Sequence, residues 1–387
     1  MRPVVIVGVG VTKCGKFLDV SLGDLAVEAV WGAIKDTDID PKAIQLAYVA
    51  NTMAFPVTGG GGTLGEKVLA HCGFGGMPVV NVENSCCGGT TALRGAFLEV
   101  ASGNCDIALA LGVEKMYSGD TSKTLTAMQG GNPYSGMGFQ FSGNYAIGLR
   151  RYMRESGATR EHFAKVAVKN SYNGSLNPYA QHQRSLTIEQ VLSSRPIADP
   201  LTLYMCCSMG DGAAAVIVCA KDVAKRFARK PLVEVAYCAL RSGSYRKIHG
   251  LDVPLPTLAA NEAYEKAGIG PEDIDIAEVH DAMAPQELIL YEQLGFCKSG
   301  EGARLIDDGR TKINGDIPVN TSGGLSSRGD PTGATGLYQT AELVWQLRGE
   351  AGPRQAENNP KVGLIQNQGG YTEFDRTSVN SVVILKN

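Results

Sequence analysis

The chain has 387 residues, of which 44 % are hydrophobic and 19 % are charged, and its net charge is −3 at pH 7. Its length suits two or three folded units of about 100–200 residues each. The apolar content predicts a large buried core and argues against a disordered chain. The mild acidity and the lack of a basic stripe argue against a nucleic-acid partner.

The cysteines and the apolar runs favour a cytoplasmic protein. Ten cysteines are present, but they form no Cys-x-x-Cys motif and no zinc-finger spacing with histidine. The sequence therefore predicts no metal site in this chain. No signal-peptide pattern and no run of about 18 apolar residues occurs, so we expect reduced thiols and no membrane contact.

Short apolar runs alternate with segments of helical periodicity along the first third of the chain. Apolar strands separated by helices predict an α/β fold whose sheets are buried on both faces. In chain order, the pattern predicts a strand at Val4–Val9, a helix at Leu22–Ile34, a strand at Leu46–Ala50, a helix at Leu64–His71, a strand at Val79–Val82, a helix at Gly89–Ala101 and a strand at Ile107–Gly112.

The middle of the chain differs in composition from its flanks. It is rich in Tyr, Ser, Asn, Gln, Arg and Gly, and it shows one clear helix near Arg160–Asn170. An apolar strand returns at Ala213–Val218, so we interpret the middle as an inserted loop domain. The predicted units are 1–116 with 200–225 as the N-terminal half, 117–199 as the insertion, and 226–387 as the C-terminal half.

The second half of the sequence repeats part of the first. Residues Ile39–Ala54 match Ile269–Ala284 without a gap, at positions 230 residues apart, and a predicted helix precedes each copy. A duplicated unit of this kind predicts two similar core halves. His280 stands at the end of the repeated strand, where open α/β sheets bind ligands.

Cys86 and Cys87 lie at a turn between a predicted strand and a predicted helix. Unpaired N–H groups and the helix dipole at such a place favour a thiolate and an oxyanion. Two structural thiols at a tight turn are the alternative.

The residues Asn84, Cys86 and Gly89 resemble the Asn-x-Cys-x-(Ser/Thr)-Gly nucleophile motif of thiolases, with Gly88 in place of the usual Ser or Thr. The motif register selects Cys86 rather than Cys87. Further segments resemble the sterol-carrier-protein-2 (SCP2) and archaeal branches in the same order, over almost the whole chain. These segments are Gly112–Met116, Cys206–Ala215, Val279–Ala282, Asn320–Gly324, Gly329–Gly336 and Ala341–Ala351.

The resemblance implies the thiolase fold, in which two duplicated βαβαβ-type halves form a layered α-β-α-β-α core with an inserted loop domain. It implies Cys86 as the nucleophile and His280 as a donor to the thioester oxygen. Coenzyme A would be the co-substrate, and Ser322 and Gly323 are predicted to contact it. The resemblance also implies a homodimer or higher oligomer, and some relatives work with a small zinc-ribbon and OB-fold partner protein.

Two positions depart from the family pattern. Asp330 stands where the family has the Gly-His-Pro histidine that takes the proton from the nucleophile. A carboxylate is a poor base for a thiol, given pKa values of about 3.9 and 8.5, although burial raises the former. The alternative is that Asp330 caps a helix that has Pro331 at its first position.

The second departure concerns the acid–base cysteine of the family. Family members carry it at one of two positions, and this chain has no cysteine at either. One position is Ala282, and the other lies in the segment Gln366–Gly370. We predict that Asn367 and the backbone of Gly369 and Gly370 form an oxyanion site there. Tyr371 follows this segment and is a candidate proton donor.

Three functions are compatible with these residues. The first is a thiolase that cleaves a 3-oxoacyl-CoA with free coenzyme A through an acyl group on Cys86, acting on a branched, aromatic or steroidal chain. The second is a retro-aldolase acting on a 3-hydroxyacyl-CoA. The third is a non-catalytic acyl-CoA-binding subunit of a complex.

Overall fold

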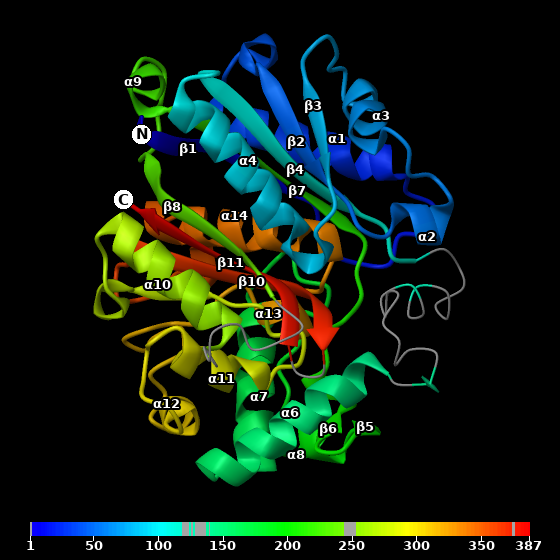
Figure 1. The fold of residues 1–387 in the computed structure, drawn as a ribbon, viewed down its shortest axis with the longest axis vertical. Helices are drawn as coiled ribbons and strands as arrows, with labels where there is room; N and C mark the ends of the chain where they lie inside the picture. Colours follow the sequence, from blue (N-terminus) through cyan, green and yellow to red (C-terminus); the bar gives the residue numbers. More distant parts are fainter. Residues whose placement is uncertain are drawn as a thin grey trace.

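The computed structural model describes residues 2–117, 124, 127, 137, 138, 140–243, 253–373 and 376–387. Within these residues nine strands form one sheet, in the order β3-β2-β4-β7-β1-β8-β11-β10-β9 (Figure 1). The strands are β1 (Val4–Val11), β2 (Leu46–Ala50), β3 (Val79–Val82), β4 (Ile107–Glu114), β7 (Gly212–Ala220), β8 (Val233–Ser242), β9 (Ile276–Glu278), β10 (Val362–Glu373) and β11 (Arg376–Lys386).

The sheet consists of two halves with the same topology. In the first half β2 is parallel to β4, and β7 lies antiparallel between β4 and β1. In the second half β9 is parallel to β10, and β11 lies antiparallel between β10 and β8. The halves meet where β1 pairs with β8 at Val5 and Ile6. The duplication predicted from the sequence is therefore confirmed in the strand order.

The halves stack helices and strands in alternating layers. The outer helices of the first half are α1 (Leu22–Thr37) and α3 (Leu64–His71), the central helices are α4 (Gly88–Ser102) and α14 (Thr335–Arg348), and the outer helices of the second half are α10 (Leu255–Ala267) and α11 (Gln286–Gln293). In β7, Val216 packs in the core around α4 and α14, whereas Ile217 packs beneath α1 and α3. In β10, Ile365 faces the central layer and Leu364 faces α10 and α11. This is the predicted α-β-α-β-α core.

The two central helices approach each other closely at their N-terminal ends. A Cβ atom on Gly89 of α4 would lie 3.0 Å from the backbone N of Leu337, and one on Gly336 of α14 would lie 2.7 Å from that of Thr90. Only glycine permits this approach, because any side chain would collide with backbone. The packing brings both helix N-termini to one place in the molecule.

The segment between the two parts of the first half is more helical than the sequence predicted. Among its described residues are α6 (Phe141–Ser156), α7 (Arg160–Ser175), α8 (Ile188–Ser193) and the strand pair β5 (Pro196–Ala198) and β6 (Leu201–Thr202). The prediction of one helix was wrong because α6 has no side-chain cap at Gln140 and α8 spans only six residues.

Apolar residues of α6 and α7, such as Leu149 and Phe163, pack into the same core cluster as α10 and α11. The segment is therefore packed on the second half. The unit boundaries taken from the sequence remain a prediction. Four short helices complete the described fold: α2 (Ala54–Thr58), α9 (Lys221–Ala224), α12 (Gly302–Asp307) and α13 (Gly324–Ser327). In the described part of the chain, no helix combines the length and apolar character needed to cross a bilayer.

Candidate active site

Cys86 lies in a one-turn 3₁₀ helix, η2 (Ser85–Cys87), directly before α4. Ser85 has a φ of +49°, a left-handed conformation that is costly for a residue other than glycine. The Asn84 amide fixes the turn to the helix by donating to the Thr91 hydroxyl at 3.0 Å. This geometry holds Cys86 at the N-terminal end of α4, as the sequence predicted.

The two neighbouring thiols point to different surroundings. The Cys87 sulfur is fully buried against β11, 3.8 Å from both the Val379 carbonyl oxygen and the Ser381 hydroxyl. The Cys86 sulfur is 3.8 Å from the Ser85 hydroxyl, and its side chain retains 8 % exposure. Burial raises the pKa of the Cys86 thiol well above its ordinary value, and the Asp330 carboxylate raises it further. Cys86 is thus the thiol that faces ionisable groups of the site.

Gly369 of β10 lies against the turn that carries Cys86, whereas Gly370 faces Ser378 of β11. A Cβ atom on Gly369 would lie 2.8 Å from the backbone N of Cys86 and 3.1 Å from that of Cys87, so this position accepts only glycine. Gly370 has a φ of +60°. The backbone of β10 therefore approaches the nucleophile's own turn.

Asn367 lies two residues earlier on β10 and is fully buried. Its amide nitrogen donates to Gln339 Oε1 of α14 at 2.7 Å, while its Oδ1 has no hydrogen-bond partner among the described residues. One N–H of the amide is thereby committed to α14. The predicted oxyanion role depends on the second N–H, and it remains a prediction.

His280 lies two residues after the end of β9 and is buried. Its backbone N–H donates to Gln366 Oε1 at 3.0 Å, and its Nδ1 has no partner among the described residues. Burial, with the Arg328 charge, lowers the pKa of His280 to about 3. The imidazole is therefore neutral at physiological pH and suited to donating a hydrogen bond rather than to carrying a charge.

Asp330 is buried and does not cap a helix. The following turn, η6 (Thr332–Ala334), begins after Pro331 and has no side-chain cap. The Asp330 carboxylate instead accepts the Thr335 hydroxyl at 2.5 Å. The capping alternative was wrong because Pro331 lies outside the helical turn. Burial raises the pKa of Asp330, while the Thr335 hydrogen bond and the Arg328 charge lower it.

Arg328 is a charged residue of the site that the sequence did not reveal. Its side chain is 1 % exposed, and its two terminal nitrogens have no hydrogen-bond partner among the described residues. The guanidinium lies 5.5 Å from the centre of the Tyr338 ring. Its positive charge lowers the pKa values of both Asp330 and His280. The only sequence signal was a basic residue two positions before Asp330.

Cys207 is a second thiol near the nucleophile that was also missed. Its backbone N–H donates to the carbonyl of Ala282 at 2.8 Å, and the next residue, Ser208, accepts from the Asp330 N–H at 2.8 Å. Burial raises the pKa of Cys207 well above its ordinary value, with contributions from Asp330 and Cys86. The tandem Cys206–Cys207 was visible, but its position beside Ala282 depends on the fold.

Ser322 and Gly323 are buried in loop packing. The Ser322 hydroxyl donates to Glu278 at 2.6 Å. Gly323 has a φ of +104°, and a Cβ atom there would lie 2.6 Å from the Cα of Gly174 in α7. These contacts hold the loop against its neighbours, and the predicted contact with coenzyme A remains a prediction.

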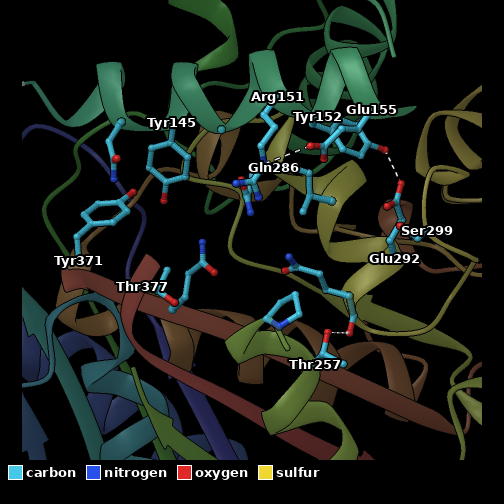
Figure 2. A pocket seen from close by; sticks show the side chains of 16 residues that line it. Tyr145, Arg151, Tyr152, Glu155, Thr257, Gln286, Glu292, Ser299, Tyr371 and Thr377 are labelled. Carbon is cyan, nitrogen blue, oxygen red and sulfur yellow. Dashed lines mark hydrogen bonds and ion pairs between the residues drawn. The ribbon is translucent and has the colours of Figure 1, made fainter. Parts of the chain in front are cut away.

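A cavity of about 410 Å³ opens between α6, α10, α11 and the β10–β11 hairpin (Figure 2). Tyr145 of α6 and Tyr371 of β10 line it, and the pKa values of both phenols respond to Cys86. Both phenols therefore lie within electrostatic range of the nucleophile. Most other lining residues are polar, among them Arg151, Gln286 and Glu292.

Comparisons with known proteins agree with this geometry. Residues 4–222 match the family model of the thiolase N-terminal domain, and residues 253–385 match the thiolase C-terminal domain-like model. The chain belongs to the thiolase superfamily, in its SCP2 and archaeal-type branch.

Individual relatives cover nearly the whole chain. An acetyl-CoA acetyltransferase of Methanothermobacter thermautotrophicus is 42 % identical over 376 residues, covering 96 % of this chain and 97 % of that protein. The benzoylsuccinyl-CoA thiolase subunit BbsB of Thauera aromatica is 39 % identical over 377 residues, covering 95 % of each. Bovine sterol carrier protein 2 is 36 % identical over 392 residues, covering 95 % of this chain and 70 % of that protein.

A solved structure named Ltp2-ChsH2(DUF35) aldolase superposes with a TM-score of 0.82 at 28 % sequence identity, covering 99 % of this chain and 97 % of that chain. The thiolase fold predicted from the sequence is confirmed.

Proposed function

We propose that the protein is a thiolase-type acyltransferase that cleaves a 3-oxoacyl-CoA with free coenzyme A, or runs the reverse condensation, through an acyl group on Cys86. The observation that carries this proposal is the position of the Cys86 thiol. It lies at the N-terminal end of α4, against Gly369 of β10 and within the influence of Asp330. The names of the acetyltransferase and thiolase relatives support the same reaction class.

In the proposed first step, the Asp330 carboxylate takes the proton of the Cys86 thiol, and the thiolate attacks the 3-keto carbon. Neutral His280 and backbone N–H groups around Gly369 donate hydrogen bonds to the developing oxyanion. Such donors each contribute about 10²–10³ in rate. The bond between C2 and C3 then breaks, and the acyl group stays on Cys86 as a thioester.

In the second step, free coenzyme A attacks this thioester and releases Cys86. Dividing the reaction in this way replaces one difficult step by two easier ones. The thiolate of Cys86 is the leaving group, so the dipole at the N-terminal end of α4, which favours an anion there, serves both steps. Ser322 and Gly323 remain the proposed contacts of coenzyme A.

The altered catalytic set supports an unusual acyl chain, and we propose a branched, aromatic or steroidal one. The rings of Phe141, Tyr145 and Tyr371 pack edge to face beside the cavity. Aromatic rings in this arrangement are worth about 0.5–1.5 kcal/mol per pair beyond their burial, so they suit an aromatic group. The relative named for benzoylsuccinyl-CoA is consistent with this choice.

Intact mass spectrometry tests the covalent step. The protein is mixed with acetyl-CoA or benzoyl-CoA, and a mass increase equal to one acyl group is expected. Cys86→Ala abolishes the adduct and lowers turnover by several orders of magnitude, whereas Cys87→Ala keeps the adduct. Full activity in Cys86→Ala, or no adduct with the unmodified protein, contradicts the proposal.

A retro-aldolase acting on a 3-hydroxyacyl-CoA is the second candidate. The specific observation in its favour is the aldolase of known structure, which superposes over nearly the whole chain. Ala282, at one family position of the second cysteine, points the same way. Product analysis separates the two reactions, because an aldolase releases an aldehyde or ketone without free coenzyme A.

We also propose a separate partner subunit and a homodimeric or higher assembly. One relative is itself named a subunit, and the solved aldolase carries two protein names. A small zinc-ribbon and OB-fold protein fits the expectation from the sequence. Co-purification of a small metal-containing protein supports this assembly, and turnover by the complex excludes a purely structural role for this chain.

A further inference from the structure

The proposed cleavage requires an acid beside C2, and the chain lacks the cysteine that related enzymes use for it. When the C2–C3 bond breaks, its electron pair remains on C2 of the departing thioester, and an acid has to protonate that carbon. The sequence has Ala282 and Asn367 at the positions where related enzymes carry a cysteine for this purpose. Neither side chain is an acid.

Two tyrosines that line the cavity lie within electrostatic range of Cys86. The ring centres of Tyr145 and Tyr371 are 5.8 Å apart with an interplanar angle of 81°, and Phe141 packs against both at 5.2 Å and 5.7 Å. Three mutually edge-to-face rings fix each other's orientation. Figure 2 shows the two phenols on facing elements, with Tyr145 on α6 and Tyr371 on β10.

The chain around Tyr371 links it rigidly to the nucleophile. Tyr371 follows the glycine pair whose first member packs against the backbone of Cys86. In the hairpin, Tyr371 pairs with Thr377 of β11. A short, sterically constrained path therefore joins the phenol to the Cys86 turn.

The Tyr371 hydroxyl is available for a new hydrogen bond. The hydroxyl is buried and makes no hydrogen bond of normal geometry with a described residue, while weaker side-chain hydrogen bonds with Tyr145 and Asn144 shift its pKa. A buried donor without a partner costs about 1–3 kcal/mol, so such an atom is retained where a ligand completes it.

We propose that Tyr371 is the catalytic acid that protonates C2 of the departing thioester, and that Tyr145 is the positioning residue that holds its phenol toward the cavity. This inference rests on the proposed function, because it concerns the proton required by carbon–carbon bond cleavage. It assigns to a tyrosine on β10 the task of the missing second cysteine.

The protons and electrons balance over the cycle. The Cys86 thiolate attacks C3, the C2–C3 electron pair passes to C2, and the Tyr371 O–H proton passes to C2, leaving a phenolate. The phenolate takes the proton of the incoming coenzyme A thiol. The coenzyme A sulfur then attacks the acyl carbon, and the bond from that carbon to Cys86 breaks, which restores the thiolate and the phenol.

The environment keeps both phenols in the required form. Burial raises the pKa of Tyr371 well above its ordinary value, and Tyr145 and Cys86 raise it further. Burial likewise raises the pKa of Tyr145. Tyr371 therefore carries its proton throughout the physiological range, and it gives the proton up only to a much stronger base such as a carbanion.

The test separates acylation of Cys86 from chemistry at C2. Acetyl-CoA and succinyl-CoA serve as probes, because cleavage of acetoacetyl-CoA or benzoylsuccinyl-CoA releases them. Acylation is followed by intact mass, and exchange at C2 by uptake of solvent deuterium into the probe. Acylation requires no proton transfer at carbon, whereas exchange does.

Tyr371→Phe is expected to acylate Cys86 at the normal rate and to lose C2 exchange and cleavage by about 10²–10⁴-fold. Tyr145→Phe keeps the ring packing and is expected to lower exchange by a smaller factor, again without affecting acylation. Tyr264→Phe is the matched control, because Tyr264 is a buried tyrosine of α10 that does not line the cavity and whose hydroxyl donates to the Leu294 carbonyl at 2.7 Å. This control should exchange like the unmodified protein.

Normal C2 exchange in Tyr371→Phe, in a protein that acylates, overturns this inference and leaves the proposed function standing. Parallel loss of acylation and exchange in Tyr371→Phe also overturns it, since that pattern indicates structural damage. The absence of any acyl adduct in the unmodified protein instead contradicts the proposed function itself.

Discussion

At the scale of single residues, the site replaces an imidazole base by a buried carboxylate. Asp330 can serve this purpose because burial raises its pKa toward that of a thiol. The Arg328 charge and the Thr335 hydrogen bond lower the same pKa and so favour the carboxylate form. The same carboxylate raises the pKa of the Cys86 thiol.

This base predicts a distinctive pH dependence. The reactive form of Asp330 is the carboxylate, so kcat/KM should fall as the pH decreases through the raised pKa of Asp330. His280, with a pKa of about 3, should add no inflection near 6.5. Asp330→Asn is expected to lose about 10²–10⁴-fold in kcat/KM and to abolish the acidic limb. Profiles of kcat/KM from pH 4 to 9 measure both effects.

Thr335→Val is the companion variant, since it keeps the Asp330 carboxylate and removes the hydroxyl that donates to it at 2.5 Å, together with a longer contact to the Pro331 carbonyl. It should move the acidic limb to higher pH, because that hydrogen bond lowers the pKa of the carboxylate. An unchanged limb in Asp330→Asn would assign the base to another residue.

At the scale of elements, one buried carboxylate connects the parts of the fold that meet at the site. Glu114, at the end of β4, accepts hydrogen bonds from the backbone N–H groups of Thr52, Met53 and Gly333 and from the Asn51 amide. Gly333 lies just before α14, so Glu114 ties the ends of β2 and β4 to the N-terminal end of a central helix. Its pKa is raised to about 7 by burial.

We expect Glu114→Gln to destabilise the fold, because the amide NH₂ group would face N–H donors. Leaving such donors unsatisfied costs on the order of 1–3 kcal/mol. Thermal unfolding at pH 8 should show a Tm lowered by several degrees, whereas Glu28→Gln, on the exposed face of α1, should leave Tm unchanged.

The pH dependence of stability gives a second measure of Glu114. Its folded pKa is raised, so the folded protein holds this proton more tightly than the unfolded chain does. The stability that protonation contributes is complete at low pH and is lost as the pH rises from about 4.5 to about 7. This component should be missing from Glu114→Gln. Equal pH dependence in both proteins would contradict the assignment.

At the scale of the whole molecule, the sheet ends in an open edge at β3. Nothing pairs with the outer side of this strand in the described chain, and Val80 is 42 % exposed there. An exposed apolar edge strand is a ready template for pairing with another chain. The expected homodimer is therefore most simply formed by β3 strands of two copies.

Val80→Lys tests this assembly, because it places like charges on the paired edges without disturbing the core. Sedimentation or light scattering should show a dimer for the unmodified protein and at least a tenfold weaker association for the variant. Leu203→Lys, at a similarly exposed apolar position far along the chain, is the control that should remain dimeric. A dimer unaffected by Val80→Lys would place the interface elsewhere.

The sequence by itself determined the layered core and the position of the nucleophile. Apolar runs located β2 and β3 to the residue, and helical periodicity located α3, because both kinds of pattern are local in the sequence. The unbroken match between Ile39–Ala54 and Ile269–Ala284 revealed the duplication. Cys86 was recognisable because a strand, a turn and a helix N-terminus follow one another in the chain.

Only the tertiary structure decided which groups surround that nucleophile. It turned Cys87 toward β11, excluded Asp330 as a helix cap and brought Arg328 beside it. It also placed Cys207 next to Ala282 and Tyr145 against Tyr371. These residues come from distant segments, and their meeting depends on strand order and helix packing. Local periodicity records whether a residue is buried, but not which distant residue lies against it.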